Sequence, residues 1–150
     1  MNASAPMAAL LVTASLIGCS HSTNHSLSVP LAATPKNSGH IANTTLTGVG
    51  DQTSLDFYIT GVPAGTLLPP RVYTFIYKGS CQKPGAVAYA MNDKVNTKSD
   101  AGANGWSFYR TAPVSISTLR SEQHSIVVRT APEDGSVDIF CGDIAKNAHP

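Results

Sequence analysis

The cysteines and histidines of this chain are the residues best suited to metal binding, redox chemistry or nucleophilic attack. Cys81 and Cys141 lack the C-x-x-C spacing and the nearby histidine that a zinc site needs. If the domain is exported and Cys19 is engaged elsewhere, these two cysteines have one possible pairing. We therefore expect a Cys81–Cys141 disulfide and no metal site, with a pair of free thiols as the less favoured alternative.

His124 is the only histidine inside the domain that we expect over residues 43–145. A Ser-His-Asp triad would need it beside Ser121 or Ser125, and neither serine lies in a Gly-x-Ser-x-Gly motif. The sequence therefore favours a surface histidine at the start of a strand, and no catalytic residue is predicted.

Carboxylates for glycoside chemistry are available in Glu133, Asp134 and Asp138. However, the run Glu133-Asp134-Gly135 is more typical of a hairpin turn than of a catalytic pair. We interpret it as a turn.

Two features could form a binding surface. The first is a set of aromatic residues, which more often pack in a core: Tyr73, Tyr77, Tyr89, Trp106, Phe108 and Tyr109. The second is the loop Leu67-Leu68-Pro69-Pro70, whose adjacent leucines either contact a partner or cover a sheet edge. The sequence leaves these two roles of the loop open.

The start of the chain resembles a bacterial lipoprotein leader. Residues 7–18 form an apolar run that is too short to cross a membrane as a helix and is typical of a secretory signal. It ends in Leu16-Ile17-Gly18-Cys19, which resembles a lipobox, although the usual basic residue before the run is missing. The resemblance implies a signal peptide over residues 1–18, a lipid anchor on Cys19 and, because Ser20 follows, the outer membrane. An ordinary secreted protein with a chance cysteine is the alternative.

Residues 19–42 are rich in Ser, Thr, Asn, Ala and Pro, which predicts a flexible tether. His21, His25 and His40 could bind a metal weakly, so a periplasmic metal-binding protein is one alternative function. A solvated tether is the favoured interpretation.

The charge pattern excludes some partners. Only 13% of the residues are charged, the formal net charge is +1, and every basic and acidic residue follows residue 35. A nucleic-acid binder would need a basic stripe, and a disordered chain would need more charge. We expect neither.

From residue 43, short runs of β-branched and aromatic residues alternate with Gly, Pro, Asn and Asp. They predict an all-β domain, an immunoglobulin-like or Greek-key β-sandwich of about eight short antiparallel strands. The expected strands are residues 44–49, 54–60, 71–78, 86–91, 105–109, 114–119, 125–130 and 137–141. Residues 92–104 are expected to form a long loop, and residues 146–150 a C-terminal tail.

Several short motifs resemble bacterial copper/zinc superoxide dismutases. They are Gly61-Val62-Pro63-Ala64-Gly65, Lys78-Gly79-Ser80-Cys81-Gln82, Ser125-Ile126-Val127-Val128-Arg129, Glu133-Asp134-Gly135 and Cys141-Gly142-Asp143-Ile144. The resemblance implies a dismutase-like sandwich. The family also pairs the two corresponding cysteines, in agreement with the expected disulfide.

The metal ligands of that family are missing here. Thr74 and Ile76 stand where the family has copper-binding histidines, and Arg129 stands at its later copper ligand. Residues 86–105, which should hold the remaining histidines, contain none. Asp138 replaces a guiding arginine, so we expect an Arg129–Asp138 ion pair over a vestigial metal site.

Together these features predict a non-catalytic exported lipoprotein of the bacterial cell envelope, without metal or other cofactor. We expect it to face the periplasm or the cell surface and to bind an unknown protein or small molecule, or to present a surface. Display outside the cell would make it an antigen candidate. A degenerate dismutase-like enzyme is a further alternative.

Overall fold

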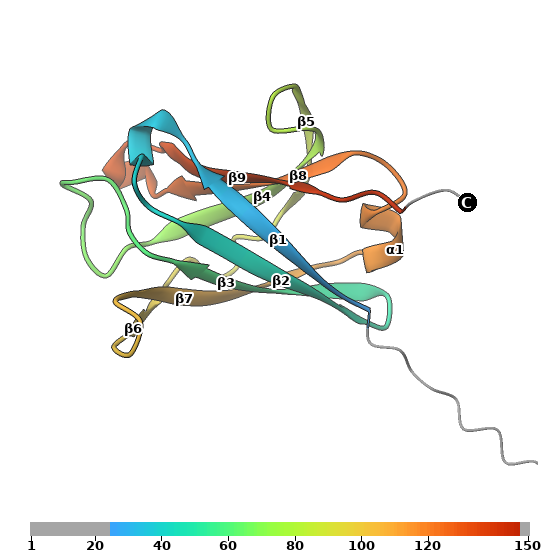
Figure 1. The fold of residues 1–150 in the computed structure, drawn as a ribbon, viewed down its shortest axis with the longest axis horizontal. Coiled ribbons are helices and arrows are strands. Elements are labelled where there is room, and N and C mark those ends of the chain that lie inside the picture. The colour runs from blue at the N-terminus through green and yellow to red at the C-terminus, as the bar shows by residue number, and fades with distance from the viewer. Residues whose placement is uncertain (1–24, 148–150) are drawn as a thin grey trace, which may run out of the picture.

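The computed structural model describes residues 25–147. That part of the chain contains nine strands, one short α-helix and two single-turn 3-10 helices, Pro35–Asn37 and Pro132–Asp134 (Figure 1). The strands are β1 (Ser26–Ala33), β2 (Ala42–Val49), β3 (Gln52–Ile59), β4 (Val72–Gly79), β5 (Pro84–Ala90), β6 (Lys98–Asp100), β7 (Gly105–Ala112), β8 (His124–Thr130) and β9 (Asp138–Ile144). The helix is α1 (Ile116–Leu119). The prediction of an all-β sandwich is confirmed.

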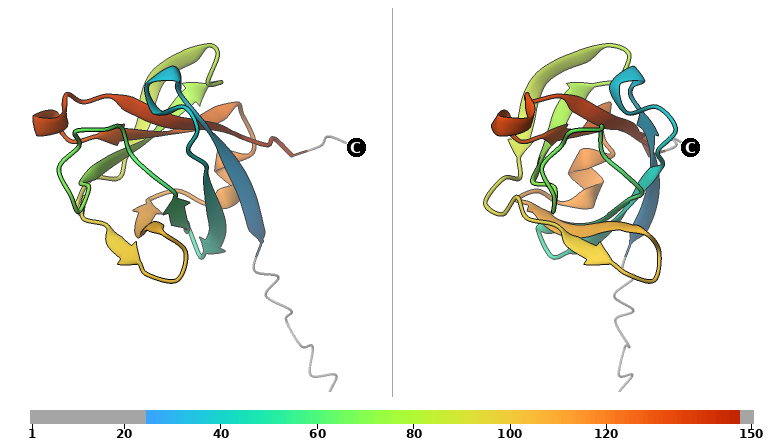
Figure 2. Two further views of the ribbon diagram at one scale, coloured as in Figure 1. Left: turned by 60° about the vertical axis from the view of Figure 1, so that its left-hand side comes forward. Right: turned by 90° about the vertical axis from the view of Figure 1, so that its left-hand side faces the viewer.

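The described strands form one antiparallel sheet in the order β5-β4-β8-β9-β1-β2-β3-β7-β6. The sheet curls so that its two halves face each other across the core, as the end-on view in Figure 2 shows. Strand β1 joins the halves, because it pairs with β2 from Ser26 to Leu31 and then with β9 through Ala32 and Ala33. The first and last strands of the fold therefore lie side by side.

Side chains alternate along the strands between the core and the outer faces. In β3 the expected inward row of Leu55, Phe57 and Ile59 is buried. Phe57 stacks on Phe108 of β7, with ring centroids 4.7 Å apart. In β4 the inward row is the one that contains Thr74 and Ile76, both of which are fully buried. This choice decides where several of the candidate site residues lie.

The predicted tether is too long, because the sandwich begins at Ser26 rather than at residue 43. Val29 and Leu31 are buried in the core, and Leu27 packs against it. These three residues alternate with polar or small ones, which is the pattern of a strand with one buried face. The high Ser and Ala content masked that pattern. Residues 19–24, like the signal peptide expected over residues 1–18, lie outside the described residues.

Two further expectations are wrong. The strand expected over residues 114–119 is the helix α1, because Ser115 caps it by accepting the Thr118 N–H at 3.2 Å and the buried Ile116 and Leu119 close one end of the core. The loop expected over residues 92–104 contains the short edge strand β6. Among the described residues no helix is long and apolar enough to span a membrane.

Candidate functional site

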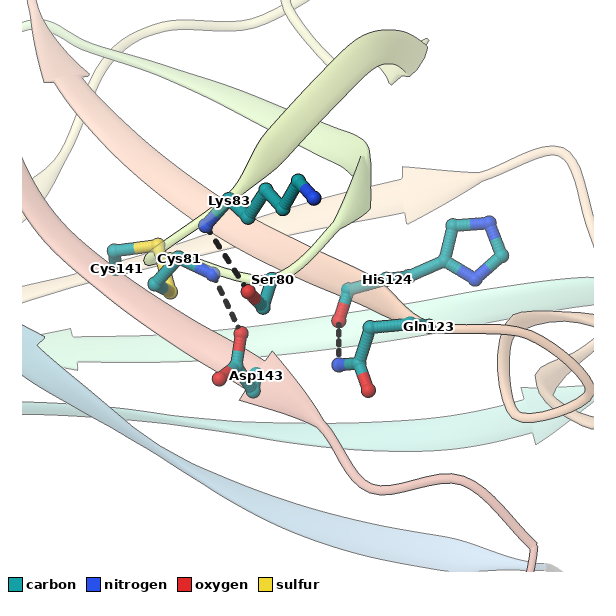
Figure 3. Close-up of a disulfide and its surroundings, with 7 residues drawn as sticks. All are labelled: Ser80, Cys81, Lys83, Gln123, His124, Cys141 and Asp143. Atoms are coloured by element: carbon teal, nitrogen blue, oxygen red, sulfur yellow. Dashed lines mark hydrogen bonds between the residues drawn. A yellow bond between two sulfur atoms is a disulfide. The ribbon is translucent and has the colours of Figure 1, made fainter.

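The disulfide between Cys81 and Cys141 is present, as predicted (Figure 3). It links the connection between β4 and β5 to β9, and so passes over the intervening strand β8. The Cys81 N–H also donates to Asp143 Oδ1 at 2.8 Å, which attaches the same connection to β9 a second time. The site is a structural brace on the outer face of the sheet.

The expected ion pair between Arg129 and Asp138 also forms. The two residues are opposite each other on β8 and β9, with Arg129 Nε 2.5 Å from Asp138 Oδ1. Arg129 Nη2 donates to the Tyr77 hydroxyl at 3.0 Å, and the guanidinium lies over the Phe75 ring at 4.9 Å from its centroid. The hydrogen bond that Arg129 donates to the Asp138 carboxylate raises the pKa of Arg129. This cluster belongs to the outer face of the sheet.

The four positions expected to form a vestigial metal site do not come together. Thr74 and Ile76 point into the core, whereas Arg129 and Asp138 lie on the outer face of the same half-sheet. Arg129 is opposite Tyr73 in the register, one residue out of phase with Thr74. The backbone of the sheet therefore separates the two pairs, because adjacent residues of a strand face opposite sides.

The aromatic residues are also divided between the two faces. Phe108 is buried in the core, while Tyr109 is exposed. Tyr73 and Tyr77 are half-buried on the outer face of β4. Tyr89 and Trp106 are partly buried and pack against the edge of the core. The expectation that this set packs in the core is therefore wrong for Tyr73, Tyr77 and Tyr109.

His124 begins β8, as predicted, but it is not a surface residue. Its exposed fraction is 5%, and Nδ1 donates to the Leu119 carbonyl at 3.0 Å. The hydroxyl of Ser121 donates to the Thr118 carbonyl, and the buried hydroxyl of Ser125 has no hydrogen-bond partner among the described residues. His124 therefore connects β8 to α1 and activates neither serine.

The run Glu133-Asp134-Gly135 lies in the connection between β8 and β9, as predicted for a turn. There, Pro132–Asp134 form a 3-10 helix that ends at Gly135, whose φ of 91° is left-handed. The carboxylates of this run hold the leucine loop, Leu67-Leu68-Pro69-Pro70. Asp134 Oδ1 accepts the Leu67 N–H at 2.9 Å, and Glu133 forms an ion pair with Arg71, the residue after the loop. Both ends of this loop are thus fixed to the β8–β9 turn.

The leucines of that loop lie at the surface. The exposed fractions of Leu67 and Leu68 are 62% and 66%, whereas Pro70 is buried. In Figure 1 this loop lies at the left end of the molecule, and β1 begins at the right end. At that right end the Gly48 N–H donates to the His25 carbonyl at 3.1 Å. The chain therefore enters the sandwich at the end opposite the leucine loop.

A groove of about 900 Å³ lies beside strand β7, and no motif in the sequence predicted it. Its lining combines outward residues of β3 and β7, inward residues of the same two strands, and residues 93–98, which lie between β4 and β6. The outward residues are Asp56, Tyr58, Ser107 and Tyr109, and the inward ones are Phe57, Phe108 and Arg110. The Val72 N–H donates to the Val95 carbonyl at 2.9 Å, which holds this segment against β4. Four basic side chains (Arg71, Lys94, Lys98 and Arg110) and two acidic ones (Asp56 and Asp93) line the groove.

Arg110 is the unusual member of this lining, because its exposed fraction is only 4%. It extends from β7 across the open side of the sandwich to β4. Nε donates to Thr74 Oγ1 at 3.1 Å, Nη2 to the Val72 carbonyl at 3.0 Å, and Nη1 to the Tyr109 carbonyl at 2.8 Å. Burial lowers the pKa of Arg110 to about 10. The sequence did carry one signal for this residue: Arg110 is in the same alternating row of the strand as the apolar Phe108 and Ala112.

No group of three or more His, Cys, Asp or Glu side chains that could hold a metal ion occurs among residues 25–147. Cys19 and His21 lie outside that range. His40 lies beside Gly61, where its ring occupies the space that a larger residue would need. Of the predicted C-terminal tail, residues 146 and 147 are described. The Asn147 N–H donates to the Arg120 carbonyl at 2.9 Å.

Comparison with known proteins gives no relative for this chain: no protein-family model, no curated protein and no solved structure matches it.

Proposed function

We propose that this protein is a non-catalytic, exported lipoprotein whose sandwich binds a partner through the leucine loop. The observation that carries the proposal is the position of Leu67 and Leu68. They are exposed, their loop is fixed at both ends, and it lies opposite the point where the chain enters the domain.

The Cys81–Cys141 disulfide supports export. Structural disulfides persist in oxidising compartments such as the periplasm and the cell surface, and are rare in the cytosol. The leader-like residues 1–18 and the lipobox-like Cys19 point to the same destination. In this proposal an acyl chain on Cys19 attaches the protein to the membrane.

Attachment at that end orients the sandwich. Only residues 20–25 separate Cys19 from β1, so a lipid on Cys19 keeps the start of β1 near the membrane. The leucine loop then points away from it. A dismutase-like ancestry would be consistent with this role, but the proposal does not depend on it.

The physical basis for binding is apolar burial on a preorganised loop. Burying a leucine side chain contributes about 1.5–3 kcal/mol. A loop that is already fixed by Asp134 and by the Arg71–Glu133 ion pair loses little conformational entropy on binding. Two adjacent leucines therefore make a small but efficient contact.

The test uses a photocrosslinking amino acid at position 67 of the full chain, expressed with its leader in a Gram-negative host. The matched control is position 49, because Val49 is similarly exposed (59%) but lies near the start of β1. We expect a discrete crosslinked product at position 67 that Leu68→Ser abolishes, and none at position 49. Leu68→Ser should leave the melting temperature unchanged, because the side chain is solvated.

Anchoring is measured in the same cells. The wild-type chain should fractionate with membranes, and Cys19→Ser should release it into the soluble periplasmic fraction. Identical crosslinks at positions 67 and 49, or a Cys19→Ser variant that stays in the membrane fraction, would contradict the proposal. Stoichiometric bound copper or zinc together with superoxide turnover would contradict its non-catalytic part.

A further inference from the structure

The charge of Arg110 is not balanced by any carboxylate of the described chain. Its three hydrogen bonds go to two backbone carbonyls and one hydroxyl, all of them neutral. The two ion pairs within residues 25–147 involve Arg71 and Arg129, not Arg110. Removing a cation from water without an opposite charge is costly. The neutral acceptors and the Phe108 ring, 4.7 Å away, offset part of that cost.

The guanidinium also has unused donors. It carries five N–H groups, and the three hydrogen bonds occupy three of them. The remaining two have no acceptor among the described residues. Arg110 lines the 900 Å³ groove and also a smaller hollow next to it, which share Asp93, Lys94 and Tyr109.

The groove around Arg110 is suited to an anion. Its basic side chains outnumber its acidic ones, and Lys94 and Lys98 are exposed on the wall formed by residues 93–98. A guanidinium matches the two oxygens of a carboxylate better than it matches a point charge. Since its pKa is about 10, Arg110 remains charged at neutral pH.

The rest of the lining is suited to a flat apolar body. Tyr58 and Tyr109 line the groove from the outward rows of β3 and β7, and the stacked pair of Phe57 and Phe108 lines it from the inward rows. Aromatic rings bind flat groups by stacking or edge-on contact. The volume lies within the range of small-molecule sites.

We propose that this groove binds a small organic carboxylate with a flat or cyclic body, and that Arg110 is the residue that receives the carboxylate. This site goes beyond the leucine loop: the two share Arg71, but Leu67 and Leu68 are not part of the groove, and Arg110, Lys94 and Tyr109 are not part of the loop. Lys94 adds long-range attraction, and Tyr109 contacts the body of the ligand.

The probe is benzoate, and its neutral analogue benzamide is the control ligand. Binding is followed by calorimetry and by the fluorescence of Trp106, the single tryptophan of the chain, which lies on β7 beside the groove. We expect saturable benzoate binding in the millimolar range or tighter, and benzamide at least about tenfold weaker, because a charge-assisted hydrogen bond contributes about 1.5–3 kcal/mol.

Two variants locate the binding. Arg110→Met should abolish the preference for benzoate over benzamide. Arg110 is buried, and its replacement leaves the carbonyls of Val72 and Tyr109 without this donor, so the variant could fail to fold. Lys94→Gln therefore provides a second test at an exposed position. Lys94→Gln should weaken benzoate several-fold and leave benzamide unchanged. Lys83→Gln, which removes the same charge near the disulfide, should change neither.

Three results would overturn the proposal. The first is no benzoate binding in the millimolar range. The second is equal affinity for benzoate and benzamide, which would indicate apolar contact alone. The third is an equal effect of Lys94→Gln and Lys83→Gln, which would indicate attraction by the overall charge of the protein rather than by this groove.

Discussion

At the scale of single residues, two arginines of this protein are in opposite electrostatic situations. Arg129 is at the outer face with Asp138 beside it, and its pKa is raised. Arg110 is buried against neutral groups, and its pKa is lowered to about 10. The first contact is local, because the two residues face each other across a hairpin. The second brings together strands that are distant in sequence.

The Arg129–Asp138 pair should contribute little by itself. Its side chains are 28% and 48% exposed, so solvent screens their attraction, and exposed pairs contribute about 0–1 kcal/mol. In a double-mutant cycle with Arg129→Gln and Asp138→Asn, we expect a coupling energy within that range. Arg129→Gln alone should cost more than Asp138→Asn, because it also removes the contacts with Phe75 and Tyr77. Urea unfolding measures both, and equal single-variant costs would contradict this account.

At the scale of elements, the pairing of the first and last strands depends on a small residue. A Cβ at Gly142 of β9 would lie 2.5 Å from both the Pro30 carbonyl oxygen and Leu31 Cδ2 of β1. Such distances are shorter than any van der Waals contact. The two halves of the sheet meet at β1, so a disturbance here affects the whole fold.

We therefore expect Gly142→Ala to destabilise the protein by about 1–3 kcal/mol or more, as overpacking does in other cores. The backbone oxygen of Pro30 cannot move aside as the end of a side chain could. Gly102→Ala is the matched control, because its Cβ would meet only Asp100 Oδ1 at 3.7 Å. Thermal unfolding of the two variants measures the difference, and the melting temperature should fall for Gly142→Ala and not for Gly102→Ala. Similar melting temperatures would show that β1 can separate from β9 at little cost.

At the scale of the whole molecule, the disulfide is the main covalent restraint on the described fold. Cys81 and Cys141 are 60 residues apart in sequence. The chain-entropy model assigns about 4 kcal/mol to closing a loop of that length. A domain of this size has only about 5–15 kcal/mol of total stability, so the bond is a large part of it.

Replacing both cysteines by serine should accordingly lower the free energy of unfolding by about 4 kcal/mol. The reduced wild-type protein should show a similar loss, and the variant should not respond to reductant. Guanidinium unfolding with and without dithiothreitol makes both measurements. Unchanged stability of the double-serine variant would show that Asp143 and the strand pairing hold the β4–β5 connection without the bond.

Much of the architecture could be predicted because local patterns carry it. The alternation of Leu55, Phe57 and Ile59 predicts a strand with one buried face. The disulfide is predictable because Cys81 and Cys141 are the two cysteines of the domain and have one possible pairing. The hairpin between Arg129 and Asp138 has a turn motif at its tip, so their contact follows from the sequence as well. Each of these features needs only neighbours in the chain or a single possible partner.

Other features were decided by the tertiary structure alone. Period-two alternation in β4 does not say which row faces inward, so the burial of Thr74 and Ile76 depends on what β7 and β8 place opposite them. The sequence of β1 likewise does not decide its structure. It is only weakly apolar, and it forms a strand because it pairs with both β2 and β9. The groove and the buried charge of Arg110 exist only once residues 93–98 cross from β4 to β6. Local sequence sets the period of a strand, whereas the packing of distant strands sets its face and its neighbours.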